Sequence, residues 1–107
     1  LARAWREGAS EARPVEEGET VAGGVRIAAP PWGRPVLAAV RESGGAIVAL
    51  SDEEILSAQE ALARKGFYVE PTSALPVAAL EHLGDRLEDS PVVVLTGSGF
   101  KSPPKVR

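Results

Sequence analysis

Residues 46–54 read Ala-Ile-Val-Ala-Leu-Ser-Asp-Glu-Glu, and this stretch decides the fold class. Its first half is an apolar run of strand length without alternating polar residues, which is typical of a strand covered on both faces. Directly after it, Ser51 and Glu54 have the spacing of a capping box, and the carboxylates of this turn favour the positive end of a helix. A buried strand that leads into a capped helix indicates an α/β protein.

The alternation of helix and strand continues on both sides of this stretch. Pro35 suits the first position of a helix that Gly44-Gly45 ends, and Gly66 stops the helix that the capping box begins. Residues 67–69 are predicted to form a short strand, and residues 91–95 a second strand that is apolar on both faces. Short connections between such elements indicate parallel strands. The expected architecture is therefore α/β, a three-layer fragment of a parallel sheet with helices on its faces.

A third helix is expected before the last strand. Thr72 or Ser73 is suited to cap it. Because proline is tolerated only in the first turn of a helix, Pro76 requires the helix to begin shortly before it. His82 lies near the end of this helix, where a hydrogen-bonding side chain suits the free carbonyl groups. A structural role is expected for His82.

Length and composition limit the chain to one small domain. It has 107 residues, of which 44% are hydrophobic and 25% charged, close to the average of soluble globular proteins. We predict one partial domain over 1–107, with an extended connecting segment over 1–32, an α/β core over 33–101 and a tail over 102–107. The chain has no methionine and begins with Leu1, so we expect it to come from inside a longer gene product.

Charge and residue usage exclude several classes of function. The net charge of −3 gives no attraction to nucleic acid, and no apolar run is long enough for a membrane span or a signal peptide. Without cysteine and with a single histidine, the chain offers no metal site. A cytoplasmic protein is expected.

Two polar segments follow predicted strands, at 70–74 and 96–99, where open parallel sheets bind ligands. Each also has a plain structural explanation, as a helix N-terminus and as a glycine turn. Residues 97–102 resemble a phosphate-binding loop, but Phe100 stands where glycine must precede Lys101, and the prolines at 103–104 prevent the helix that should follow. That motif is therefore excluded.

Four segments together share the pattern of one known family. They read Glu-Thr-Val-Ala-Gly-Gly-Val at 19–25, Val-Ala-Leu-Ser-Asp-Glu-Glu-Ile at 48–55, Gly-Phe-Tyr-Val-Glu-Pro-Thr-Ser-Ala at 66–74 and Val-Val-Leu-Thr-Gly-Ser-Gly-Phe-Lys at 93–101. In this order they resemble the pyridoxal-phosphate enzymes of fold type II, which include threonine synthases, threonine deaminases and serine racemases. The last segment is most similar to the V-x-L-T-G-H-G-L-K of threonine synthases.

The resemblance implies an enzyme that uses pyridoxal phosphate for elimination or replacement on a small amino-acid substrate. For threonine synthase, a lyase of threonine biosynthesis, this is the conversion of O-phosphohomoserine and water to threonine and phosphate. Thr96 matches the residue whose hydroxyl bonds the pyridine nitrogen, and Gly24 the small residue against which the ring lies flat. Glu70, Ser73 and Gly97 are expected to line the cofactor pocket.

Departures from the family pattern limit what the resemblance implies. Ser98 stands where threonine synthases usually carry histidine, and residues 28–33 differ from their G-N-P-x-S-W, so the substrate is left open. The S-x-K segment with the Schiff-base lysine and the phosphate-binding loop have no match. We therefore expect a C-terminal part that holds no catalytic residue, is inactive alone and needs the remainder of its parent chain.

Two other interpretations remain open. The chain could be a non-catalytic α/β module with a regulatory or interaction role, or a small nucleotide-binding domain that depends on residues 96–99 alone. Under any of these, strands apolar on both faces leave a sheet edge that invites pairing with another copy, so a homo-oligomer is expected.

Overall fold

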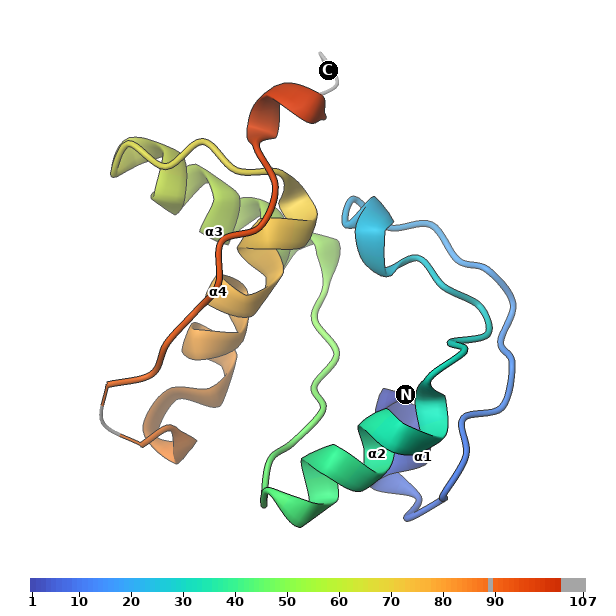
Figure 1. Ribbon diagram of the computed structural model, residues 1–107. Helices are drawn as coiled ribbons and strands as arrows, with labels where there is room; N and C mark the ends of the chain where they lie inside the picture. The colour runs from blue at the N-terminus through green and yellow to red at the C-terminus, as the bar shows by residue number, and fades with distance from the viewer. Residues whose placement is uncertain (89, 103–107) are drawn as a thin grey trace. The chain divides into compact units, whose positions relative to one another are not determined.

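The computed structural model describes residues 1–88 and 90–102, which divide into two units by their contacts. One unit consists of Leu1–Gly18 and Arg26–Ala49, and the other of Glu19–Val25 and Leu50–Arg107. The chain is coloured along its length in Figure 1, so that both segments of each unit can be followed. Apart from Ser102, the predicted tail, including the prolines at 103–104, lies outside the described residues.

Two helices, α1 (Ala2–Arg6) and α2 (Gly33–Glu42), form the first unit. Leu37 of α2 is fully buried and Ala4 of α1 is also buried. The Arg41 guanidinium donates a hydrogen bond of 3.2 Å to the Ala4 carbonyl, which ties the end of α2 to α1. Helix α2 begins before Pro35, the residue predicted to start it, because Pro35 fits anywhere in the first turn, where its missing N–H is not needed.

The second unit is built on two consecutive helices, α3 (Asp52–Arg64) and α4 (Pro71–Leu83), which pack against each other (Figure 1). Three single-turn 3₁₀ helices complete its described part: η1 (Gly23–Val25), η2 (Gly84–Arg86) and η3 (Gly99–Lys101). Small side chains dominate its core, which consists of Ala22, Ile55, Ala58, Val69, Ala74 and Ala78. Small residues at a helix contact allow the helix axes to approach closely.

Helix α3 begins and ends as predicted. The Ser51 hydroxyl accepts a hydrogen bond of 3.2 Å from the Glu54 N–H, and the Glu54 carboxylate accepts one of 2.7 Å from the Ser51 N–H. Both halves of the capping box are therefore formed. At the other end, Gly66 has a φ of 92°, a left-handed conformation that glycine adopts without steric cost.

The prediction for the start of α4 was wrong. Glu70 is the N-cap residue and Pro71 the first helical residue, so Thr72 and Ser73 lie inside the first turn rather than in front of it. Pro71 suits this position because its ring already has a helical φ. Pro76 consequently lies in the helix interior, where it cannot donate the backbone hydrogen bond that would reach the Thr72 carbonyl.

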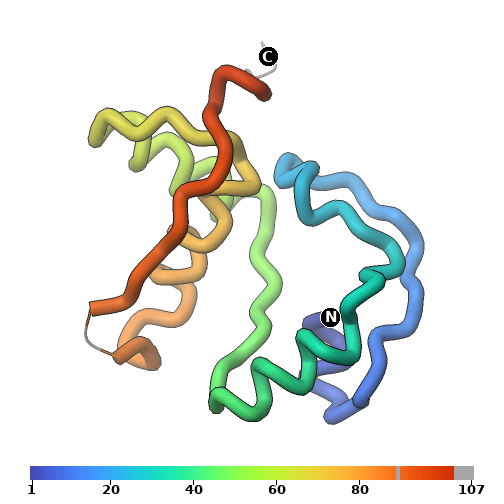
Figure 2. Tube along the Cα trace, viewed as in Figure 1, coloured from blue at the N-terminus to red at the C-terminus, as the bar shows by residue number. Residues whose placement is uncertain are grey.

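The parallel sheet predicted from the apolar runs is not found among residues 1–88 and 90–102. Residues 46–50 and 91–95 contain no assigned strand. The course of both segments can be followed along the tube in Figure 2. The one strand pairing in this part of the chain is an isolated bridge between Val69 and Ser98, and it is antiparallel. Val92 and Val94 are 90% and 69% exposed, so the described residues do not cover the last predicted strand.

In the part of the chain that the structure describes, no helix combines the length and the apolar character that a bilayer span requires.

Candidate functional site

All five predicted site residues lie in the second unit, and all belong to or contact residues 70–73 at the start of α4. They are Gly24, Glu70, Ser73, Thr96 and Gly97. They come from three stretches of sequence: the turn η1, the first turn of α4, and the loop before η3. The structure thus brings together what the sequence presents as separate motifs.

Thr96 is held by its backbone. Its N–H donates a hydrogen bond of 2.8 Å to the Ser73 hydroxyl. Ser73 is only 1% exposed, and its own N–H bonds the Glu70 carbonyl at 3.0 Å. Ser73 therefore does not present a free side chain to a ligand; its hydroxyl is engaged in fixing the loop that carries Thr96.

The Thr96 hydroxyl is available for a hydrogen bond to a ligand. Thr96 is exposed, and its side chain has no hydrogen-bond partner among the described residues. A hydroxyl can donate one hydrogen bond and accept two. Because the backbone of Thr96 is fixed while its side chain is unengaged, the residue offers a positioned hydroxyl.

Gly24 lies against Thr72. The Gly24 N–H donates a hydrogen bond of 3.0 Å to the Thr72 hydroxyl. A Cβ on Gly24 would lie 2.9 Å from the Thr72 Cγ2, closer than real Cβ contacts. A side chain at position 24 would therefore have to displace Thr72. Sequence reasoning assigned Thr72 only a capping role; its place in the same motif as Ser73 was the available signal.

Glu70 and Gly97 are neighbours through backbone and side chain. The Glu70 N–H bonds the Gly97 carbonyl at 3.0 Å, and the Gly99 N–H bonds the Tyr68 carbonyl at 3.0 Å. A Cβ on Gly97 would collide with the Glu70 carboxylate, which lies over the Gly97 backbone. Gly97 is buried, and its role in the structure is to let Glu70 pack closely.

The segment that carries Gly24 has a second attachment, which sequence reasoning missed. The Asp52 carboxylate, at the start of α3, accepts hydrogen bonds from the Thr20 hydroxyl at 2.7 Å and from the Val21 N–H at 3.1 Å. Ala22, which follows, is fully buried in the core. Residues 20–24 are thus attached to the first turns of both α3 and α4.

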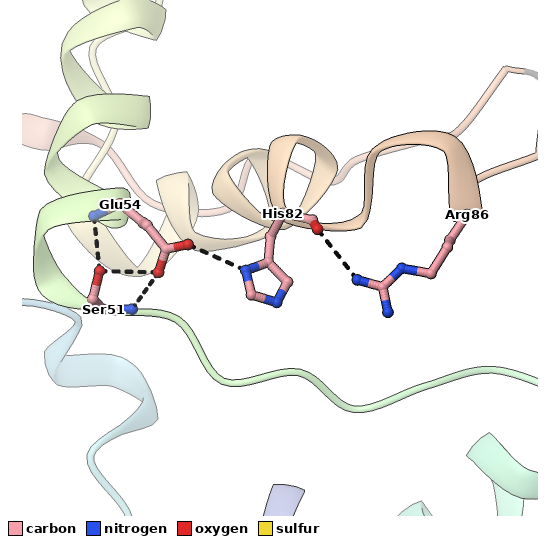
Figure 3. A network of polar contacts seen from close by, with 4 residues as sticks. All are labelled: Ser51, Glu54, His82 and Arg86. Carbon is pink, nitrogen blue, oxygen red and sulfur yellow. Dashed lines mark hydrogen bonds and ion pairs between the residues drawn. The ribbon is translucent and has the colours of Figure 1, made fainter.

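A further polar network links the start of α3 to the end of α4 (Figure 3). The Glu54 carboxylate of the capping box lies 3.2 Å from the His82 Nδ1, and the Arg86 guanidinium bonds the His82 carbonyl at 3.4 Å. The backbone hydrogen bond from Ser51 above all, and then the His82 side chain, lower the pKa of Glu54. The His82 side chain joins two helices, and the Arg86 guanidinium rather than the His82 ring bonds a carbonyl group near the end of α4.

The arrangement at residues 70–73 gathers polar groups and a backbone surface without a side chain. It combines an exposed glycine, a positioned free hydroxyl and a carboxylate. Lys65 and Lys101 are both exposed, at the end of α3 and in η3, and Lys105 lies outside the described residues. Within 1–88 and 90–102, no three carboxylate, histidine or cysteine side chains gather where a metal ion could bind.

Comparison with known proteins gives a consistent result. The sequence profile of the family described as "Pyridoxal-phosphate dependent enzyme" matches residues 1–99. The threonine synthase of Methanosarcina acetivorans is 41% identical over 111 residues, which cover 99% of this chain and 27% of that protein. The threonine synthase of Halalkalibacterium halodurans is 42% identical over 94 residues, covering 83% of this chain and 27% of that protein.

A solved structure is also similar. The crystal structure of a threonine deaminase from T.th. matches with a TM-score of 0.74 and 32% identity, covering 91% of this chain and 35% of that one. The chain thus spans about a quarter of the length of the curated relatives that it matches, namely 27% of the first two.

Proposed function

The chain belongs to the family of pyridoxal-phosphate-dependent enzymes, and on that premise we propose that it is part of an enzyme of the threonine synthase kind. Pyridoxal phosphate is the cofactor of this family. The proposed reaction converts O-phosphohomoserine and water to threonine and phosphate, which makes the substrate a small amino acid. The observation that carries the proposal is the convergence of the five site residues on the first turn of α4, around one free hydroxyl.

The residues of this chain would bind and orient the cofactor ring. Thr96 would offer its hydroxyl to the pyridine nitrogen, and Gly24 a flat backbone surface to the ring. Glu70 and Gly97 would line the same site. Ser73 would act indirectly, by holding the backbone of Thr96. When bound, the cofactor supplies an electron sink for the bond that breaks in the amino acid; a neutral hydroxyl at its nitrogen tunes that sink rather than maximising it.

We further propose that residues 46–50 and 91–95 belong to a parallel sheet whose other strands come from the rest of the protein, as in the α/β enzymes of fold type II. The exposure of Val92 and Val94 supports this, because apolar strands are normally covered on both faces in parallel sheets. In this proposal residues 33–101 form the core of a partial domain.

The lysine that holds the cofactor would come from another segment of the protein. Covalent capture needs an amine placed against the cofactor aldehyde, and this sequence contains no S-x-K motif. The chain alone should therefore be inactive, while the complete protein should form a borohydride-reducible cofactor adduct. A stoichiometric adduct at one lysine of the isolated chain, with turnover of phosphohomoserine, would overturn this part of the proposal.

Replacement of Thr96 tests the site. In the complete protein, Thr96→Val should lower turnover and change the absorption spectrum of the bound cofactor, because the ring nitrogen loses its partner. Stability of the cofactor-free protein should change by less than about 1 kcal/mol, since the hydroxyl has no partner to lose among the described residues. Thr96→Ser, which keeps the hydroxyl, is the matched control. An unchanged spectrum and turnover in Thr96→Val would show that Thr96 does not contact the cofactor.

A further inference from the structure

Two consecutive hydroxyl residues of α4 bond two different segments of the chain. The Thr72 hydroxyl accepts a hydrogen bond from the Gly24 N–H at 3.0 Å, and the Ser73 hydroxyl accepts one from the Thr96 N–H at 2.8 Å. The partners are 48 and 23 residues away in sequence. One helical turn therefore holds both segments to which the proposed function assigns contacts with the cofactor ring.

We propose that Thr72 and Ser73 are positioning residues, which fix the distance and orientation between the Gly24 backbone and the Thr96 hydroxyl. This inference depends on the proposed function, because it concerns the ring that Gly24 and Thr96 would contact. Neither hydroxyl needs to touch the cofactor. Each hydroxyl accepts a hydrogen bond from a backbone N–H, so that the groups facing the ring are in place before the cofactor binds.

The helix is well suited to this task because it is itself firmly held. Pro71 fixes the backbone at its first position, and Ala74 is fully buried directly after Ser73. Successive residues of a helix have a set rise and rotation, so the two hydroxyls have a fixed relative placement. The Asp52 carboxylate, which bonds the Val21 N–H, prevents the segment before Gly24 from moving away.

The Ser73 contact has the larger expected effect. Ser73 is 1% exposed, so its removal would leave the Thr96 N–H without its partner next to a buried surface. The loop could then rotate. The Thr96 hydroxyl would still be present but would no longer point toward the pyridine nitrogen. A displacement of the order of 1 Å is enough to impair an interaction that depends on alignment.

The test uses the complete protein, with and without pyridoxal phosphate. Ser73→Ala removes the acceptor, Ser73→Cys keeps a side chain of similar size with a weaker acceptor, and exposed Ser57→Ala on α3 is the matched control. Without cofactor, amide hydrogen exchange at Thr96 should be roughly tenfold faster in Ser73→Ala, intermediate in Ser73→Cys and unchanged in Ser57→Ala. Likewise, Thr72→Val should accelerate amide exchange at Gly24, whereas Thr72→Ser, which keeps the hydroxyl, should leave the exchange rate at the wild-type value.

With cofactor bound, the spectra of single and double variants decide the matter. Ser73→Ala should shift the cofactor spectrum in the same direction as Thr96→Val, and Ser73→Ala/Thr96→Val should shift it no further than Thr96→Val alone. Additive shifts, or a wild-type spectrum in Ser73→Ala while Thr96→Val is altered, would overturn the positioning role and leave the proposed function intact. A wild-type spectrum in Thr96→Val would overturn the assignment of Thr96 itself, and the positioning role with it.

Discussion

Three glycines of the site region are explained by individual side chains opposite them. A Cβ on Gly24 would meet Thr72, one on Gly97 would meet the Glu70 carboxylate, and one on Gly99 would lie 2.7 Å from the Tyr68 ring. None of the three has the positive φ that commonly requires glycine. They permit close approach, so part of the glycine pattern reflects packing within this chain rather than contact with a ligand.

The contact between Gly24 and Thr72 gives a prediction at this scale. In the cofactor-free complete protein, Gly24→Ala should reduce the free energy of unfolding by about 1–3 kcal/mol, the usual cost of an overpacked contact. Combination with Thr72→Ala should remove much of that cost, because the colliding atoms are gone. Denaturant unfolding of both single variants and the double variant measures the coupling.

The neighbouring Gly23 provides the control. Nothing lies within 4 Å of a Cβ built there, so Gly23→Ala should leave stability nearly unchanged. If the costs of Gly24→Ala and Thr72→Ala simply add, the steric explanation for Gly24 is wrong.

The sequence named candidate site residues but not the contacts that hold them in place. Thr96 and Gly24 could be named because each stands in a motif. The hydrogen bond between the Ser73 hydroxyl and the Thr96 N–H could not be anticipated. Its two partners are 23 residues apart and stand in two separate motifs, neither of which shows the other. The hydrogen bonds that the Asp52 carboxylate accepts from Thr20 and Val21 were missed for the same reason.

Among the elements, local chemistry predicted helix α3 and misplaced the start of α4. The capping box and the stop at Gly66 act within a few residues, so they could be seen in the sequence and were confirmed. At α4 the preference of Ser and Thr for caps competed with the preference of proline for the first helical position, and Pro71 determined the outcome. The hydroxyls left inside the helix then became available for tertiary contacts.

The capping box also gives a pH prediction. Because the pKa of Glu54 is lowered in the folded state, its contribution to stability is complete above the usual glutamate pKa and is lost as pH falls through the lowered value. Glu54→Gln should therefore make the stability of the second unit less dependent on acid pH. The measurement is unfolding followed between roughly pH 3 and pH 7.

Glu53→Gln is the matched control, since it removes the same charge from the same helical turn without touching Ser51 or His82. It should retain the acid dependence of the wild type. Equal effects of the two variants would mean that helix-dipole charge, and not the Ser51 and His82 contacts of Glu54, is responsible.

For the molecule as a whole, the apolar runs predicted strand positions but not strand pairing. Residues 91–95 have the expected composition, yet the described residues provide them with no neighbouring strand. Pairing depends on partners that a strand's own sequence does not contain. The chain matches 27% of the length of the Methanosarcina acetivorans threonine synthase, and any strand on the rest of that length would lie outside this sequence.

The exposed apolar segment at 91–95 predicts association of the isolated chain. Val92 and Val94 are 90% and 69% exposed, and unpaired apolar strands favour pairing between copies. We expect a dimer or larger oligomer at micromolar concentration, measured by light scattering after size exclusion, and a shift towards monomer in Val92→Lys/Val94→Lys. A wild-type monomer of 11.2 kDa that is stable to heating would contradict this and favour a self-sufficient regulatory module.

The two units are interleaved along the chain, and this has a consequence for dissection. The polypeptide passes from one unit to the other at residues 18–19, 25–26 and 49–50, so no single cut separates them. A truncation that begins at Leu50 would lose Ala22 from the core of the second unit and leave Asp52 and Thr72 without the groups that they bind. The short segment 19–25 is thus a structural insert that any excised form of the second unit must carry, for example re-joined through a linker ahead of Leu50.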